Sequence, residues 1–132
     1  MIEAEESTKT LKPPPSKKGL ARLIAAAGYS AAGIRAAFKS EEAVRMEIAA
    51  FMVLAPLGLW LGDGAIEKVL LVSCLVFVIV VELLNTGIEK VVDRVGKDYH
   101  ELSRVAKDIG SAAVFISLGL VIFTWAMLLV LF

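Results

Sequence analysis

Three apolar segments dominate the sequence and leave few folds open to it. Residues 48–62 and 69–81 contain no charged side chain, and residues 109–132 continue for 24 residues without one. A helix needs about 20 apolar residues to cross the hydrocarbon core of a bilayer. The third segment is long enough by itself, whereas the first two reach that length only if their polar flanks are buried in protein. The chain is therefore predicted to be an all-α membrane protein with spans at about 43–61, 66–89 and 108–131.

The composition agrees with one membrane domain and argues against several other classes. The chain has 132 residues, of which 58% are hydrophobic, well above the fraction typical of soluble domains. Its 14 acidic and 14 basic residues cancel, so no net positive charge indicates binding to nucleic acid. Cys74 is the single cysteine, which excludes a disulfide within one chain and a Cys/His metal site.

The first 18 residues differ from the rest in being polar, and they include a triple proline. They lack the apolar core of a secretory signal peptide. Such a composition is typical of disorder, and we predict a disordered cytoplasmic tail at 1–18. Residues 19–132 are then predicted to form the one folded domain.

Lysine and arginine are unevenly distributed among the segments that flank the spans. Most precede the first span or lie between the second and third, whereas the connection at 62–68 holds only Lys68. Positively charged connections stay on the cytoplasmic side of a membrane. The N-terminus is therefore predicted to be cytoplasmic and the C-terminus to lie outside.

A separate amphipathic helix is predicted at about 19–40, before the first span. Arg22 and Tyr29 share one face of this helix. An apolar arc of about 100° covers the opposite face, and it consists of Leu20, Leu23, Ile24, Ala27, Ala31, Ile34 and Phe38. This pattern is typical of a helix that lies in the cytoplasmic interface. Two roles stay open for it: a simple membrane anchor, or a cover whose polar face shields or lines a site.

Polar residues at helical spacing interrupt the end of the second span. Glu82, Asn85, Glu89 and Asp93 recur at spacings of three and four residues, so one helix carries them as a single stripe. Glu82 would lie about 10 Å deeper in the membrane than Glu89. A charge at that depth costs several kcal/mol, so we expect these side chains to face the interior of the bundle and to serve function.

More polar and charged residues gather at the same cytoplasmic level. They are Glu41, Glu42, Arg45 and Glu47 before the first span, and Arg94, Lys97, Asp98, Tyr99, His100, Glu101, Arg104, Lys107, Asp108 and Ser111 around the second connection. Carboxylates suit Mg²⁺, lysine and arginine suit phosphate oxygens, and a recessed glutamate suits a general base. Together they favour phosphoryl transfer to an alcohol dissolved in the membrane. No P-loop or other nucleotide motif is present, and a proton-coupled transporter or channel subunit also fits paired carboxylates inside the membrane.

Several stretches resemble the bacterial integral-membrane diacylglycerol kinases. They are AAGYSAAGIRAAF at 26–38, EAVRME at 42–47, VELLNTGIEKVVDRVG at 81–96 and YHELSRVAKDIGSAAV at 99–114. The resemblance covers about residues 20–132. It implies a homotrimer in the bacterial inner membrane, with a periplasmic C-terminus and with sites shared between protomers at the cytoplasmic interface. It also implies Mg²⁺, ATP as co-substrate and diacylglycerol as the lipid converted to phosphatidic acid.

The resemblance also implies roles for individual residues. Glu82 matches the general base and Asn85 a helper beside it, while Glu41 and Glu89 match the carboxylates that hold Mg²⁺ with ATP. The expected nucleotide contacts are Arg22, Tyr29, Glu41, Glu89, Asp98, Tyr99, His100, Lys107 and Asp108. The expected lipid contacts are Ala31, Arg35, Arg45, Glu47, Lys68, Glu82 and Ser111.

Two other functions also fit the sequence. An undecaprenol kinase shares the plan of three spans, although the stretch HELSRVAKD with Arg94 favours diacylglycerol as the substrate. A bundle that conducts protons without catalysing a reaction is the rival from a different class. Ala31, Ala32, Phe38, Glu42 and Pro56 depart from the pattern of the family, which affects the expected lipid fit and stability and leaves the stripe intact.

Overall fold

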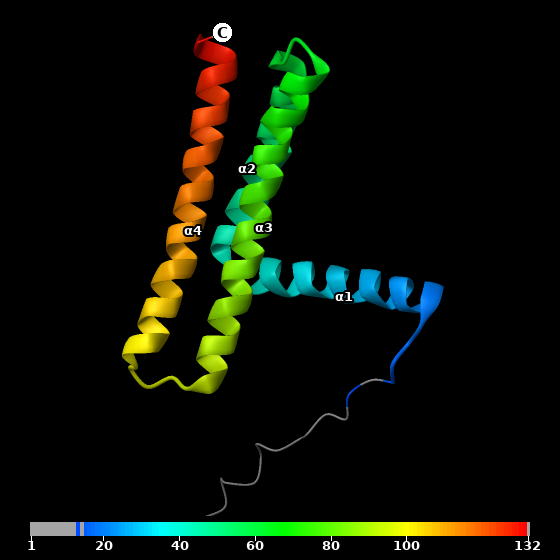
Figure 1. Ribbon diagram of the computed structural model, residues 1–132, viewed down its shortest axis with the longest axis vertical. Helices are drawn as coiled ribbons and strands as arrows, with labels where there is room; N and C mark the ends of the chain where they lie inside the picture. The colour runs from blue at the N-terminus through cyan, green and yellow to red at the C-terminus, as the bar shows by residue number, and fades with distance from the viewer. Residues whose placement is uncertain (1–12, 14, 132) are drawn as a thin grey trace, which may run out of the picture. The chain divides into compact units, whose positions relative to one another are not determined.

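The structure is a computed structural model that describes residues 13 and 15–131 (Figure 1). All its regular elements are helical: α1 at Gly19–Ser40, α2 at Glu42–Leu61, α3 at Ala65–Val95, α4 at Glu101–Ala126, and a π-helical end, η1, at Met127–Leu131. The all-α prediction is thus confirmed for the described residues. The predicted disordered tail, residues 1–18, falls mostly outside them. Residues up to Gly33 and residues from Ile34 onward form two compact units.

The first unit contains most of α1. Gly19 opens the helix with a φ of 60°, a left-handed conformation that glycine adopts without a steric cost. Leu20, Leu23 and Ile24 of the apolar arc are each about two-thirds exposed or more, with values of 73%, 67% and 66%. The helix therefore presents the apolar face that the sequence predicts, and nothing within its own unit covers that face.

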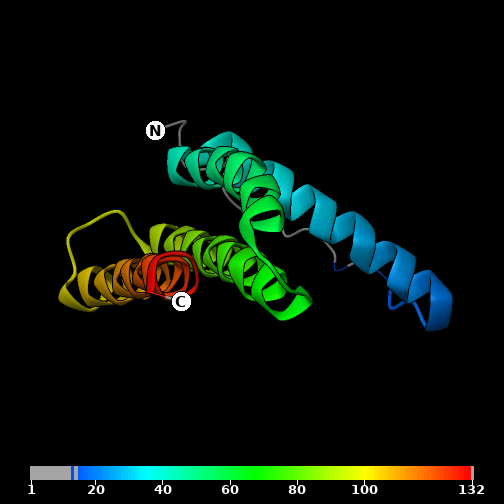
Figure 2. The same ribbon diagram turned by 90° about the horizontal axis from the view of Figure 1, so that it is seen from above.

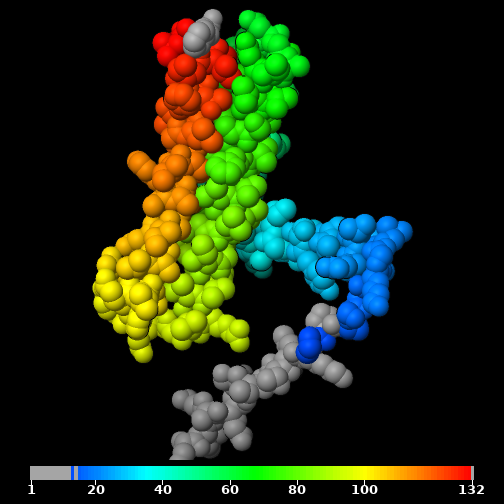
Figure 3. All heavy atoms as spheres, viewed as in Figure 1, coloured from blue at the N-terminus to red at the C-terminus, as the bar shows by residue number. Residues whose placement is uncertain are grey.

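The second unit is built around α3, which packs against α2 and against α4. Figures 1 and 2 show α3 and α4 side by side along their length, and in Figure 3 their atoms meet over the visible face. Ala55, Cys74 and Leu75 form the buried core. The partly buried residues packed against it are Phe51, Leu54, Val72, Val121 and Trp125. Cys74 is thus a small core residue, as its apolar neighbours in the sequence suggest.

One hydrogen bond and one close approach between helices also hold the second unit together near its buried core. Trp125 of α4 donates its indole N–H to the carbonyl oxygen of Leu71 at 3.2 Å. Gly58 of α2 lies so close to α3 that an added Cβ would be 3.2 Å from Cβ of Leu71. Three helices thus meet at this level: α2 through Gly58, α3 through Leu71 and α4 through Trp125.

Helices α2, α3 and α4, the last continued by η1, are each long and apolar enough to cross a membrane. Most of their outer surface is apolar, and Phe115 and Ile116 of α4 are 78% and 71% exposed. Such a surface fits lipid or a second protomer and would not suit water. Only 6% of the apolar window of α4 is buried, compared with 39% for α3, so α3 is the interior helix of the unit.

Helices α3 and α4 extend beyond the predicted spans at the connection between them. α3 continues to Val95, not 89, and α4 begins at Glu101, not 108. No glycine or proline interrupts residues 88–95, and His100 caps α4 by accepting a hydrogen bond from the backbone N–H of Leu102. The 31 residues of α3 rise by about 46 Å, which exceeds the ~30 Å hydrocarbon core. The ends that carry the charged residues therefore project beyond it.

Candidate functional site

The polar stripe of α3 becomes less buried along the helix. Glu82 and Asn85 are buried, with 6% and 8% of their surface exposed, Glu89 is half-buried, and Asp93 is exposed. The helical spacing had predicted that these residues share one face, and the structure places that face against the other helices. A buried carboxylate thus leads step by step to the surface at the end where α3 and α4 are connected.

Three carboxylates, those of Glu41, Glu47 and Glu89, each lie within electrostatic range of Glu82. Glu82 interacts with Glu41, at the junction of α1 and α2, and with Glu89 one turn beyond Asn85. Glu47 of α2 interacts with Glu82, and its Oε2 atom is buried without a hydrogen-bond partner. Like charges this close repel one another, so the group favours protons or cations as ligands. Sequence analysis had selected all four residues without showing that they converge.

Asn85 connects this group internally. Its side-chain Nδ2 donates a hydrogen bond to Oε1 of Glu89 at 3.3 Å. Its Oδ1 is buried and has no hydrogen-bond partner, and the same is true of Oγ1 of the adjacent Thr86. Unpaired polar atoms are costly to bury, which is why they often mark a place reserved for a ligand or water. The bond joins Asn85 to Glu89, and its expected role as a helper beside Glu82 stays a prediction.

Glu41 and Glu89 are the residues that were predicted to hold a magnesium ion. The described residues contain no group of three or more His, Cys, Asp or Glu side chains arranged to hold a metal. Mg²⁺ bound with a nucleotide needs only one or two carboxylates, because phosphates and water complete its shell. Glu41 already holds a cation, since its Oε1 accepts from Nζ of Lys90 at 3.1 Å and from Oγ of Ser40 at 3.1 Å. The donor set therefore suits a hard divalent cation.

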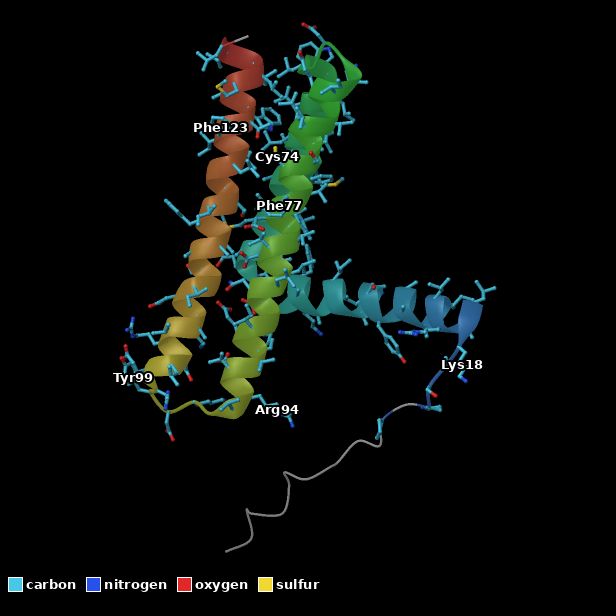
Figure 4. All side chains as sticks on the ribbon, in the orientation of Figure 1. Lys18, Cys74, Phe77, Arg94, Tyr99 and Phe123 are labelled. Atoms are coloured by element: carbon cyan, nitrogen blue, oxygen red, sulfur yellow. The ribbon has the colours of Figure 1, made fainter. Side chains whose placement is uncertain are left out.

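A pocket of about 450 Å³ opens at the connection between α3 and α4. Figure 4 shows Arg94 and Tyr99 at this end of the helix pair, opposite the C-terminus. The polar or charged residues of the lining are Asp93, Lys97, Asp98, Tyr99, His100, Arg104 and Lys107. Four predicted nucleotide contacts, Asp98, Tyr99, His100 and Lys107, are thus brought to one pocket of mixed charge.

Two ion-pair systems order this pocket. Nζ of Lys107 contacts Oδ1 of Asp93 at 2.7 Å, and this ammonium lowers the pKa of Asp93, which lies beyond the predicted span. Arg104 pairs with Asp108 at 2.8 Å and also with Glu101, to which Tyr99 donates its hydroxyl hydrogen at 3.1 Å. These exposed pairs contribute little to stability. They hold Lys107 and Arg104 where phosphate oxygens could replace the carboxylates.

Some predicted site residues belong to the first unit or to the opposite end of α3. Arg22, Tyr29 and Ala31 belong to the first unit, where Arg22, Tyr29 and Lys17 line a hollow of about 430 Å³. Lys68 lies on the first turn of α3, about 21 Å along the helix from Glu82. These residues keep their assignments as predictions only.

Arg45, Arg35 and Ser111 were also predicted to contact the lipid. Arg45 donates to the backbone carbonyl oxygens of Phe38 and Lys39 at 2.8 and 3.2 Å, which caps the end of α1. Arg35 and Ser111 are exposed. In this arrangement Arg45 stabilises the bend between two helices, a role that its position in the sequence did not indicate.

Three residues of this site, Asp93, Arg104 and Lys90, have contacts that were not predicted. Asp93 was expected to serve function as part of the stripe but not at the nucleotide pocket, which it lines, and it pairs with Lys107. Arg104 also lines the pocket, and its spacing to Glu101 and Asp108 could have indicated the ion pairs. The pair between Lys90 and Glu41 joins residues 49 apart, and no local pattern predicts it.

Comparisons with known proteins agree with the resemblance seen in the motifs. Residues 28–129 match the family described as prokaryotic diacylglycerol kinase. The chain is 50% identical over 111 residues to the diacylglycerol kinase of Escherichia coli strain K12, covering 84% of this chain and 91% of that protein. It is 47% identical over 107 residues to the diacylglycerol kinase of Haemophilus influenzae, covering 81% and 91%. For that of Pseudomonas aeruginosa the identity is 42% over 121 residues, covering 90% and 98%.

Proposed function

The chain belongs to the prokaryotic diacylglycerol kinase family, and on this premise we propose that it transfers the γ-phosphate of ATP to the free hydroxyl of diacylglycerol. The products are phosphatidic acid and ADP. The observation that supports this reaction within the chain is the row from buried Glu82 through Asn85 to half-buried Glu89, which ends beside a pocket of mixed charge. A lipid acceptor can reach one end of this row from the membrane and a nucleotide the other end from water.

Glu82 is proposed as the general base. The hydroxyl oxygen of diacylglycerol attacks the γ-phosphorus, the bond from that phosphorus to the bridging oxygen breaks, and the hydroxyl proton passes to the carboxylate of Glu82. Glu82 and Glu89 lie on one face of α3, about 10 Å apart along the helix. The acceptor hydroxyl is proposed to bind between the base and the phosphate site.

Glu41 and Glu89 are proposed to hold Mg²⁺ together with the phosphates of ATP. When bound, the ion would neutralise phosphate charge and polarise the transferred group. Lys90 would then lose Glu41 as its ion-pair partner, because the cation would bind that carboxylate. Lys107, Asp108, Asp98, Tyr99 and His100 are proposed to contact the nucleotide, and Arg22 and Tyr29 of the amphipathic helix to complete that site.

The lipid side of the site is proposed to include Glu47 and Ser111 beside Glu82, with Ala31, Arg35, Arg45 and Lys68 along the path of the lipid. A homotrimer in the inner membrane is proposed, with a cytoplasmic N-terminus and a periplasmic C-terminus. The apolar outer surface of α4 supports an assembly within a membrane. The surplus of lysine and arginine before α2 and between α3 and α4 supports the orientation.

A phosphorylation assay in mixed micelles tests the function. The full chain would receive γ-labelled ATP and Mg²⁺ with diacylglycerol and undecaprenol in separate reactions. Glu82→Gln is the test variant, and Glu67→Gln on the first turn of the same helix is the matched control. We expect labelled phosphatidic acid from the wild type and from Glu67→Gln, and none from Glu82→Gln.

Other outcomes would redirect the proposal. Preferential labelling of undecaprenol would keep the mechanism and change the substrate. A folded protein that labels neither lipid and passes protons in liposomes would replace the kinase with a proton-conducting bundle. Equal activity of the wild type and Glu82→Gln would remove Glu82 from the role of base.

A further inference from the structure

Gly110 of α4 lies in direct contact with Asn85 of α3. Gly110 is buried, and a Cβ added to it would overlap the side-chain oxygen Oδ1 of Asn85. The oxygen therefore occupies the place where any other residue at 110 would carry its Cβ. This also explains why Oδ1 is buried without a hydrogen-bond partner, because it faces the backbone of a glycine.

The contact is specific to this glycine. A Cβ added to Gly119, on the same helix, would meet nothing within 4 Å. The same holds for Gly87, which follows Asn85 and Thr86 on α3. Gly58 also approaches a neighbouring helix, but there the nearest atom is 3.2 Å away, a tight contact without overlap. Of these four glycines, only Gly58 and Gly110 lie close against a neighbouring helix. At Gly110 alone, the space that a Cβ would need is occupied by a polar side chain of the proposed site.

We propose that Gly110 is a positioning residue, which holds Asn85 in the rotamer that orients Glu89 for the divalent cation. The proposal rests on the proposed function, in which Glu89 is a ligand of Mg²⁺. With its oxygen seated against Gly110, Asn85 directs Nδ2 to Oε1 of Glu89 at 3.3 Å. Partners that orient a metal-bound carboxylate typically contribute 10- to 100-fold to metal affinity or activity.

A methyl group at 110 would force a definite change. Asn85 has two rotatable side-chain bonds, whereas α3 and α4 are packed along their length, so the asparagine is the part that moves. Rotation of its side chain removes Nδ2 from Glu89 and leaves that carboxylate without its donor. The three atoms nearest to the added methyl group all belong to Asn85, and none belongs to Glu82.

Manganese binding to the full chain in detergent tests the proposal. Mn²⁺ prefers the same oxygen ligands as Mg²⁺, and electron paramagnetic resonance measures its free fraction without turnover when a non-hydrolysable ATP analogue is present. The variants are Gly110→Ala, Gly119→Ala as the matched control, Asn85→Ala, and the double variant Asn85→Ala/Gly110→Ala. The melting temperature and oligomeric state of each variant are recorded alongside.

The expected pattern separates positioning from packing. Gly110→Ala weakens Mn²⁺ binding roughly tenfold at a nearly unchanged melting temperature, and Gly119→Ala binds as the wild type does. The double variant binds no more weakly than Asn85→Ala, because the alanine at 85 no longer collides with the added methyl group. If Gly110→Ala does not assemble, the double variant decides, and binding equal to that of Asn85→Ala supports the proposal.

Three outcomes would overturn it: wild-type Mn²⁺ binding by Gly110→Ala, losses that add in the double variant, or a lower melting temperature with Mn²⁺ binding retained. The lipid phosphorylation assay is a separate measurement, which tests the proposed function. A wild type that binds Mn²⁺ but labels no lipid would overturn the proposed function, while the effect of Gly110 on Mn²⁺ binding would still be measured.

Discussion

The two halves of α3 are similarly buried but differ in chemistry. The first half buries Leu71, Cys74, Leu75 and Val78 against α2 and α4. Its backbone also accepts a hydrogen bond from the indole N–H of Trp125. The second half buries Glu82, Asn85 and Thr86. In or beside this second half, one oxygen each of Glu47, Asn85 and Thr86 is buried without a partner.

The difference indicates that stability and reactivity are separated along one helix. Each unpaired buried polar group costs about 1–3 kcal/mol, whereas buried apolar side chains stabilise the fold. The apolar half thus stabilises the bundle and offsets the cost of a polar half that is retained for ligands. Substitutions in one half should then change unfolding without changing the reaction, and substitutions in the other half should do the reverse.

The largest expected effect belongs to Glu82→Gln. Loss of a general base lowers kcat by about 10²–10⁴-fold. Removing a buried charge near three other carboxylates should leave resistance to unfolding unchanged or improved. Measuring kcat and the denaturation midpoint on the same preparation checks both expectations. A variant that lost activity only in proportion to lost folded protein would contradict the separation.

Leu71→Ala tests the opposite half. Leu71 is fully buried, with 0% of its surface exposed, and truncation of such a leucine typically costs about 2–5 kcal/mol. The expected result is a lower denaturation midpoint with kcat per folded molecule within about threefold of the wild type, a shift below ~1 kcal/mol in the barrier. Denaturation in detergent and an active-site titration give the two numbers. A large fall in kcat would show that the two halves are coupled.

Glu89→Gln should have a smaller effect that depends on the cation. The amide keeps the volume of the side chain but weakens cation binding, so we expect a loss of about 10–100-fold at low Mg²⁺. Raising Mg²⁺ should recover part of the activity, which a titration of rate against Mg²⁺ would measure. Leu71→Ala serves as the comparison, because its activity should depend on Mg²⁺ in the same way as that of the wild type. A loss that excess Mg²⁺ leaves unchanged would argue against Glu89 as a ligand.

Much of this arrangement could be predicted from local spacing. The helical period places Glu82, Asn85, Glu89 and Asp93 on one face, and the structure shows that face turning inward, with Glu82 and Asn85 buried. The three long apolar helices were likewise predicted from hydropathy. Such features depend on neighbours within a few residues, which is why the sequence contains them.

Contacts between distant residues could not be predicted in this way. The pair of Glu41 with Lys90 and the contact of Gly110 with Asn85 depend on how helices are placed against one another. The turns of α3 and α4 beyond the predicted spans could not be read from hydropathy, because hydropathy marks the membrane boundary and not the end of the helix. The hydrogen bonds from Arg45 to the carbonyl oxygens of Phe38 and Lys39 were likewise not predicted, because they depend on the bend between α1 and α2.

The smallest expected effect lies at the exposed limit of the polar half, in the pair of Asp93 and Lys107. The ammonium of Lys107 keeps the pKa of Asp93 below that of an ordinary aspartate, so this carboxylate stays charged as the solution becomes acidic. In Lys107→Gln the pKa of Asp93 should rise toward its usual value, and the titration should begin at higher pH. Site-specific ¹³C labelling and NMR of the side-chain carboxyl would measure both curves.

Salt and nucleotide sharpen the same measurement. Because the pair is exposed, added salt should move the wild-type pKa of Asp93 in the same direction as the substitution. A nucleotide that draws Lys107 to its phosphates should also raise this pKa, since the carboxylate then loses its partner. An Asp93 titration that nucleotide leaves unchanged would place the phosphates elsewhere. The pocket at the α3–α4 connection would then be separate from the reaction, and the polar half would act through Glu82, Asn85 and Glu89 alone.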